Sequence, residues 1–188
     1  ILEGYPWYGD WGRETMIALP DLTLVTRRFL EAKEILTTFA GACSQGMIPN
    51  RFPDHGEIPD YNSVDASLRF VHAVDRYLAY TGDVKGVGSD IWNVISEIIE
   101  AYSEGTRYGI QADDDGLLTA GEPGVQLTWM DAKVGDWVVT PRSGKPVEVT
   151  ALWVHALSVA STHAEFFDDR AFAETCAGRK KKAAASFE

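Results

Sequence analysis

An aspartate inside an aromatic segment is the best catalytic candidate in the sequence. Asp131 follows Trp129 and Met130 in the stretch QLTWMDAK at 126–133. Glycoside hydrolysis uses two carboxyl groups, one of which must be protonated near neutral pH. Apolar neighbours favour the protonated form because they remove water from the carboxyl group. Two plainer roles for Asp131, a helix cap or an ion pair with Lys133, stay open.

Tryptophan and tyrosine lie beside carboxylates, Asn and Arg in the irregular parts of the chain. An indole face packs the apolar C–H face of a sugar, and polar side chains hydrogen-bond its hydroxyl groups. The composition therefore favours a carbohydrate site that needs no cofactor. The alternative is that these indoles only fix loops to the body of the protein. The tryptophans outside the periodic segments are Trp7, Trp11, Trp129 and Trp137.

The charge and the cysteine content exclude several classes of partner. The net charge is −11, which repels phosphate backbones and anionic membranes, so we expect no nucleic-acid or membrane partner. No stretch approaches the ~18 apolar residues of a membrane helix.

The two cysteines form no CxxC motif, and His55, His72, His155 and His163 form no ligand-spaced pair, so we expect no metal site. A reduced, cytoplasmic setting is the expectation.

Six segments show the periodicity of amphipathic helices. They are 13–19, 29–42, 63–80, 89–102, 147–160 and 164–186, and one short strand is predicted at 136–140. The segment 147–160 is apolar on nearly every side, which is typical of a helix buried all round. Asn62 or Ser63 is expected to cap the third helix. The predicted class is mainly α, with helical hairpins as the unit.

Two connecting segments are longer than compact domains usually need. They are 43–62 and 104–146, and irregular loops above ~15 residues are usually functional or disordered. The aromatic residues of the second segment favour an ordered loop that lines a site. Residues 111–122, QADDDGLLTAGE, also resemble a calcium-binding loop, although Gln111 stands at position 1 and Pro123 follows. An acidic turn is the alternative.

Three long motifs resemble a known family. They are GYPWYGDWGRETMIALPDL (4–22), GMIPNRFPDHGEIPDYNSVDASLRFVHAV (46–74) and DGLLTAGEPGVQLTWMDAKVGDWVVTPRSGKPVEVTALWVHAL (115–157). In this order and spacing they resemble the glucosidase domain of bacterial and archaeal glycogen debranching enzymes, of the amylo-α-1,6-glucosidase type. The resemblance implies a six-hairpin α/α barrel, or toroid, with long active-site loops at one end. It also implies inverting hydrolysis of α-1,6-linked glucose at the branch points of glycogen or a similar α-glucan.

The resemblance assigns roles to individual residues. The aspartate of the TWMD motif, the expected general acid, falls on Asp131, and the WGRD-type motif that helps to hold the non-reducing glucose reads WGRE here. The family usually has Asp at Glu14, Asn at Thr150 and Tyr at Val154. Trp7 belongs to the same loop, and its indole is expected to pack against the sugar as well. The expected substrate-binding residues are Trp7, Trp11, Arg13, Glu14, Asn62, Asp65, Trp129, Lys133 and Glu148.

The number of helices sets an expectation about completeness. A six-hairpin barrel needs about twelve helices, so residues 1–188 are expected to be one unit, the N-terminal half of the catalytic domain. The general base is then expected beyond Glu188, and the chain alone is expected to be inactive. Uncovered apolar faces predict self-association. A non-catalytic glycan-binding module and another α/α-barrel glucosidase, such as a glucoamylase or trehalase, are the alternatives.

Overall fold

The structure is a computed structural model that describes residues 10–52 and 58–187. It is mainly helical, as the periodicity predicts. Its helices are α1 (Gly12–Leu19), α2 (Phe29–Gly41), α3 (Asp65–Thr81), α4 (Val84–Glu104), α5 (Val147–His163) and α6 (Arg170–Phe187). A π turn at Pro20–Leu24 continues α1, and 3-10 turns lie at Arg107–Gly109 and Ala164–Phe167.

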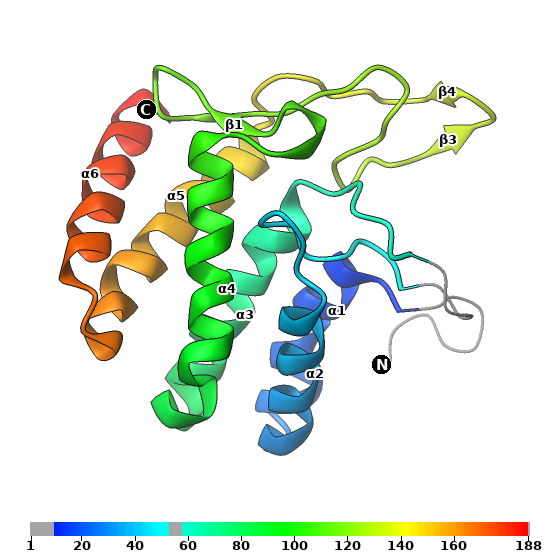
Figure 1. Ribbon diagram of the computed structural model, residues 1–188. Coiled ribbons are helices and arrows are strands. Elements are labelled where there is room, and N and C mark those ends of the chain that lie inside the picture. Colours follow the sequence, from blue (N-terminus) through cyan, green and yellow to red (C-terminus); the bar gives the residue numbers. More distant parts are fainter. Residues whose placement is uncertain (1–9, 53–57, 188) are drawn as a thin grey trace.

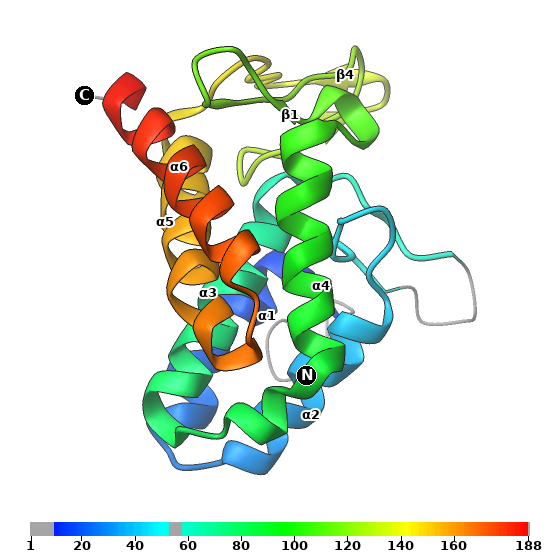
Figure 2. The same cartoon turned by 60° about the vertical axis from the view of Figure 1, so that its left-hand side comes forward.

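The helices lie in two layers and run alternately up and down (Figure 1). Helices α1, α3 and α5 pack side by side in one layer, and α2 packs against α4 in the other. Helix α6 packs against α5, as Figure 2 shows from a second side. The described residues thus form a mainly α fold of antiparallel helical hairpins.

The long connections gather at one end of the helices, the top in Figure 1. Two antiparallel hairpins lie there: β1 (Gln111–Ala112) pairs with β2 (Leu118–Thr119), and β3 (Lys133–Val134) pairs with β4 (Trp137–Val138). The strand predicted at 136–140 is therefore confirmed, but it is shorter than expected. The second long loop is ordered, and it is tied to the body where the Val64 N–H donates to the Leu127 carbonyl at 2.8 Å.

The core is formed by the facing apolar sides of α2, α3, α4 and α5. Its largest buried side chains include Phe39, Phe70, Tyr102 and Trp153. The two polar atoms that they bring inside are paired: the Tyr102 hydroxyl donates to the Val64 carbonyl at 3.0 Å, and Trp153 Nε1 donates to the Gly116 carbonyl at 3.1 Å. Both acceptors belong to the loop end, so these core residues also hold the loops in place.

Two helices differ from the predicted ranges because single residues take left-handed backbone angles. Helix α4 begins at Val84, earlier than the predicted start at 89. Gly88 has φ 55° and kinks the helix, so the regular part of α4 begins after Gly88, as predicted. The last helix, predicted at 164–186, is confirmed from Arg170 on, but its start is wrong. Asp168 has φ 56°, which ends the preceding 3-10 turn, and α6 starts at Arg170.

The prediction that the helix at 147–160 is buried all round is also wrong. Val147 is 64% exposed, and polar side chains on α5 meet α3. His155 Nε2 lies 3.0 Å from His72 Nδ1, and His163 Nε2 lies 2.9 Å from Asp75 Oδ1. Burial, and then the nearby His155, lower the pKa of His72. These four half-buried side chains form what we call the α3/α5 seam.

Candidate active site

Arg13 is the residue around which the candidate site is organised. It is 3% exposed and lies in the first turn of α1, facing the start of α3. Its Nε donates to both carboxylate oxygens of Asp65, at 3.0 and 2.9 Å. Its Nη1 donates to Asp131 Oδ2 at 3.0 Å, so one guanidinium joins two carboxylates from distant parts of the chain. Burial alone would lower the pKa of Arg13, but the charges of Asp65, Glu14 and Asp131 and the hydrogen bonds to Asp65 together raise it.

Helix α1 is placed by a close backbone contact at its first residue. The Gly12 N–H donates to the Asn50 carbonyl at 2.8 Å. A Cβ at position 12 would lie 2.0 Å from the Pro49 carbonyl oxygen, so only glycine fits here. The contact fixes the start of α1 against the first long loop, and it directs Arg13 towards α3.

Asp65 is an interior carboxylate with a full set of partners. Its side chain is 1% exposed. The Ser63 hydroxyl donates to Asp65 Oδ1 at 2.8 Å and also accepts from Arg13 Nη2 at 3.2 Å. The same hydroxyl accepts from the Ala66 N–H at 3.2 Å, which confirms Ser63 in the expected capping role. Asp65 therefore anchors Arg13 rather than facing a ligand freely, because a buried charge needs paired and hydrogen-bonded neighbours.

The segment that carries Asp131 is held by a second Arg–carboxylate pair. The Arg142 guanidinium donates hydrogen bonds to both carboxylate oxygens of Glu148, and the bond from Nη2 to Oε2 is 2.7 Å long. Arg142 Nη1 also donates to the Thr128 hydroxyl at 3.4 Å, and that oxygen accepts from the Met130 N–H at 3.3 Å. The hydrogen bond from Arg142 lowers the pKa of Glu148. Helix α5 thus positions the turn that precedes Asp131.

A small hollow of ≈ 210 Å³ opens beside Asp131. Its walls come from the residue before α1 and from both long loops. The residues that line it are Trp11, Asn50, Arg51, Asp60, Asn62, Gln126 and Asp131. An indole, three amide side chains and two carboxylates around one hollow form the kind of surface that a sugar ring with its hydroxyl groups would fit.

Some polar atoms at this end of the molecule are buried without a partner. Among the described residues, Asn50 Oδ1 and Glu14 Oε2 have no hydrogen bond. Asn50 is 2% exposed and lines the hollow. Buried acceptors in native proteins are nearly always satisfied, by water or ligand where protein groups do not serve. A ligand hydroxyl group in the hollow would donate the hydrogen bond that Asn50 Oδ1 lacks.

Comparison with known proteins gives the family. The model of the amylo-alpha-1,6-glucosidase family matches residues 1–188. The chain belongs to the amylo-alpha-1,6-glucosidase family. A 73-residue stretch is 41% identical to a protein of Saccharomyces cerevisiae that is described as glycogen debranching enzyme. That match spans 39% of this chain and 5% of the yeast protein.

The structure brings several of the expected site residues together. Arg13, Asp65 and Asp131 form one hydrogen-bonded group. Glu14 Oε1 lies 3.6 Å from Arg13 Nη1, so the carboxylate that replaces the usual Asp still reaches the group. Trp11, Asn62 and Asp131 line the hollow.

Other expected residues lie at the edge of the site or outside it. Trp129 is 53% exposed and does not enclose Asp131 as the expected apolar wall would. Lys133 Nζ donates to the Gly124 carbonyl at 2.9 Å, and the ion pair of Asp131 is formed with Arg13 instead. Glu148 supports the loop through Arg142 and does not line the hollow. Trp7 lies outside the described residues.

Several residues of the hollow were not predicted from the sequence. Asn50, Arg51, Asp60 and Gln126 line it, and Ser63 and Arg142 hold the carboxylates around it. Asn50 and Arg51 were within reach, since both stand in the quoted motif 46–74. Their role depends on the pairing of the Arg51 backbone with Asp60 and Trp11, which only the folded loop shows.

The resemblance of residues 111–122 to a calcium loop is explained by a hairpin. Strands β1 and β2 pair across this segment, and Lys145 Nζ lies 2.8 Å from Asp113 Oδ2 and 2.7 Å from Asp115 Oδ2. A lysine ammonium thus occupies the place between the two carboxylates where a cation would bind. The acidic turn, the alternative interpretation, is the one that the structure supports.

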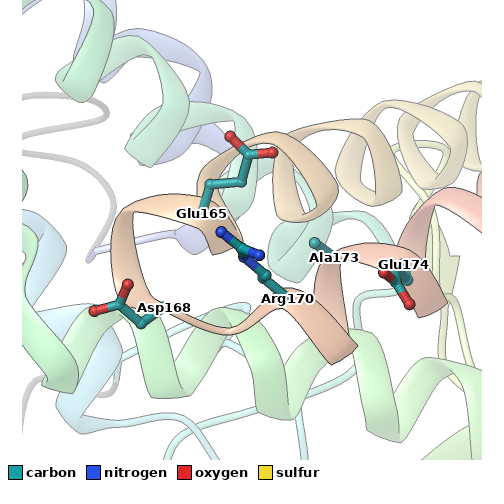
Figure 3. Close-up of a pocket in the computed structure, with 5 residues that line it drawn as sticks. All are labelled: Glu165, Asp168, Arg170, Ala173 and Glu174. Carbon is teal, nitrogen blue, oxygen red and sulfur yellow. The ribbon is translucent and has the colours of Figure 1, made fainter.

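A larger hollow, of ≈ 470 Å³, lies at the other end of the helices, around the start of α6. Figure 3 shows Arg170 between the carboxylates of Glu165, Asp168 and Glu174. Only charged residues and Ala173 line it, with no aromatic side chain to pack a sugar ring. Its size alone therefore does not make it the substrate site.

Proposed function

We propose that this chain forms part of the active site of an enzyme that hydrolyses α-1,6-linked glucose at the branch points of glycogen or a similar α-glucan. The observation that carries the proposal is the Arg13 guanidinium, which joins Asp65 to Asp131 beside a hollow lined by an indole and amides. Family membership and the match to a glycogen debranching enzyme support the substrate class. In this proposal the two layers of antiparallel hairpins form about half of a six-hairpin α/α barrel.

In this proposal Asp131 is the general acid. Arg13 donates to Oδ2, so Oδ1 is the oxygen that carries the proton. The proton passes to the glycosidic oxygen as the bond between that oxygen and the anomeric carbon breaks. A water molecule attacks the anomeric carbon from the opposite face, and a second carboxylate takes its proton. Inverting enzymes hold these two carboxyl groups about 6.5–9.5 Å apart, which leaves room for the water.

We assign the general base to a carboxylate outside the described residues. Asp65 is buried and fully engaged by Arg13 and Ser63, and Asp60 is held by Arg51 at 2.8 Å. Neither is free to accept a proton from water without losing a cationic partner.

The test is Asp131→Asn in the natural full-length protein, assayed on an α-1,6-branched dextrin. Loss of a general acid is expected to lower kcat by about 10²–10⁴-fold, while dextrin binding changes little. Asp136→Asn is the matched control, because Asp136 is an exposed carboxylate in the turn between β3 and β4. Normal turnover by Asp131→Asn would overturn the assignment. A wild-type protein that binds dextrin without hydrolysis would instead support a glycan-binding module.

A further inference from the structure

The α3/α5 seam brings together metal-binding side chains that lie far apart in the sequence. His72 and His155 are 83 positions apart, yet their facing ring nitrogens lie 3.0 Å from each other. Asp75 is the third member, and one ligand atom from each of the three lies within 4.8 Å of the others. All three side chains are half-buried. None takes part in the proposed hydrolysis.

We propose that the α3/α5 seam binds a divalent transition metal ion of the zinc class through His72, His155 and Asp75. Two imidazoles and one carboxylate form a ligand set that Zn²⁺ commonly uses, with a water in the fourth position. Zinc bonds of about 2.0–2.2 Å place neighbouring tetrahedral ligand atoms roughly 3.3 Å apart. The 3.0 Å between the His72 and His155 nitrogens is close to that value. The ligand atoms of all three residues lie within 4.8 Å of one another, so Asp75 would have to move nearer to the two nitrogens to complete the site.

His163 supports this site from α5 without being one of its ligands. An ionised carboxylate can only accept, so His163 Nε2 donates its proton to Asp75 Oδ1 at 2.9 Å. Side chains that ligate metals are often oriented by such a second hydrogen bond. His163 Nδ1 is buried and has no partner among the described residues. His163 is thus a positioning residue that turns the Asp75 carboxylate towards the two imidazoles.

The surrounding charges allow a cation. Arg69 and Arg76 lie on the same helix as His72 and oppose positive charge there. Arg69 Nε, however, is 3.5 Å from Asp65 Oδ2, and the Arg76 guanidinium lies over the Tyr80 ring at 5.7 Å from its centroid. Asp75 offsets part of the remaining charge, and neutral imidazoles add none of their own.

The position of the seam gives the bound ion a structural role. His72 follows Asp65 by seven residues in α3, and His155 follows Glu148 by seven in α5. Seven residues are about two helical turns, or roughly 10 Å, so both histidines lie on the same faces as the residues that organise the candidate active site. An ion in the seam would join α3 to α5 below that site and stabilise the folded state, because it binds only when the helices are packed.

The experiment is a titration of the chelator-treated full-length protein with Zn²⁺ alone, followed by calorimetry, and with Co²⁺ alone, followed by absorption. We expect one ion per chain, a Co²⁺ spectrum typical of nitrogen and oxygen ligands, and a rise in the midpoint of thermal unfolding with Zn²⁺. His72→Gln and His155→Gln are each expected to weaken binding by at least tenfold and to abolish the thermal shift. His163→Gln is expected to weaken binding by about 10–100-fold, as a supporting residue does.

Asp75→Asn is also expected to weaken binding by at least tenfold, and Asp168→Asn is its matched control. Asp168 is exposed, lies outside the seam and has a left-handed backbone that Asn also accepts, so its substitution should leave the affinity unchanged. Circular dichroism of each metal-free variant confirms that it is folded. Absence of stoichiometric binding by the wild-type protein would overturn the proposal. So would binding that survives both histidine variants. Because the readout is metal binding, the result does not depend on the proposed hydrolysis.

Discussion

Replacement of Arg13 by methionine should be far more harmful than the loss of an ordinary salt bridge. Methionine fills similar space but removes the charge and all the hydrogen bonds to Asp65, Asp131 and Ser63. Asp65 then stays 1% exposed with only the Ser63 hydroxyl and Arg69, at 3.5 Å, as partners. Removal of one member of a buried ion pair typically costs about 3–5 kcal/mol, since the other charge remains buried.

The prediction can be measured as the free energy of unfolding in urea, with tryptophan fluorescence as the signal. For a chain of this size, each kcal/mol corresponds to about 2–4 °C in the midpoint of thermal unfolding, so Arg13→Met should lower the midpoint by roughly 6–20 °C. Arg51→Met is the matched control. The Arg51–Asp60 pair is just as short, at 2.8 Å, but its side chains are 44% and 50% exposed. Its loss should cost about 0–1 kcal/mol.

A double variant separates buried charge from lost packing. In Arg13→Met with Asp65→Asn no uncompensated buried charge remains, so the double variant should be more stable than the sum of the single changes predicts, by about 1 kcal/mol or more. An Arg13→Met variant that loses no more stability than Arg51→Met would contradict a buried, paired charge at Asp65. Additive effects of the changes at Arg13 and Asp65 would contradict it as well.

Two further predictions concern the elements that carry the site. Gly12→Ala should destabilise the protein by about 1–3 kcal/mol, measured by urea unfolding, because its Cβ would lie 2.0 Å from the Pro49 carbonyl oxygen; Gly41→Ala, with nothing within 4 Å, should be neutral or slightly stabilising. Glu148→Gln should destabilise the protein near pH 7, and the difference from wild type should shrink as the pH falls below 4.5. Arg142 lowers the pKa of Glu148 in the folded state, so the stabilisation exists above the unfolded pKa and is lost as the pH falls through the folded one. A pH-independent difference, or an alanine at position 12 that costs nothing, would contradict these accounts.

Local signals in the sequence were sufficient for the helices. Apolar periodicity predicted α2, α3 and α5 to within a few residues, because each has one continuous face that must leave water. The errors occurred where backbone angles decide the outcome. Asp168 takes a left-handed conformation that composition does not reveal, and it divides what reads as one helix at 164–186. The polar residues of α5 were overlooked because the surrounding residues are apolar.

The motifs predicted Asp131, Arg13 and Asp65 as site residues, but not how they are joined. The hydrogen bond between Arg13 and Asp131 spans 118 positions, and no local pattern fixes such a contact. It depends on the packing of α1 against α3 and on the hydrogen bond from Val64 to Leu127, which holds the second loop above them.

The helical class, the resemblance to a family and the residue types available for chemistry can be read from the chain alone, since they follow from side-chain periodicity and from motifs that are continuous in the chain. Which of those side chains meet depends on how the helices and loops pack. It paired Asp131 with Arg13 and not with the nearby Lys133, and it brought His72 to His155 across two helices. The physical reason is that helix packing sets distances between residues far apart in sequence, whereas periodicity describes only one helix at a time.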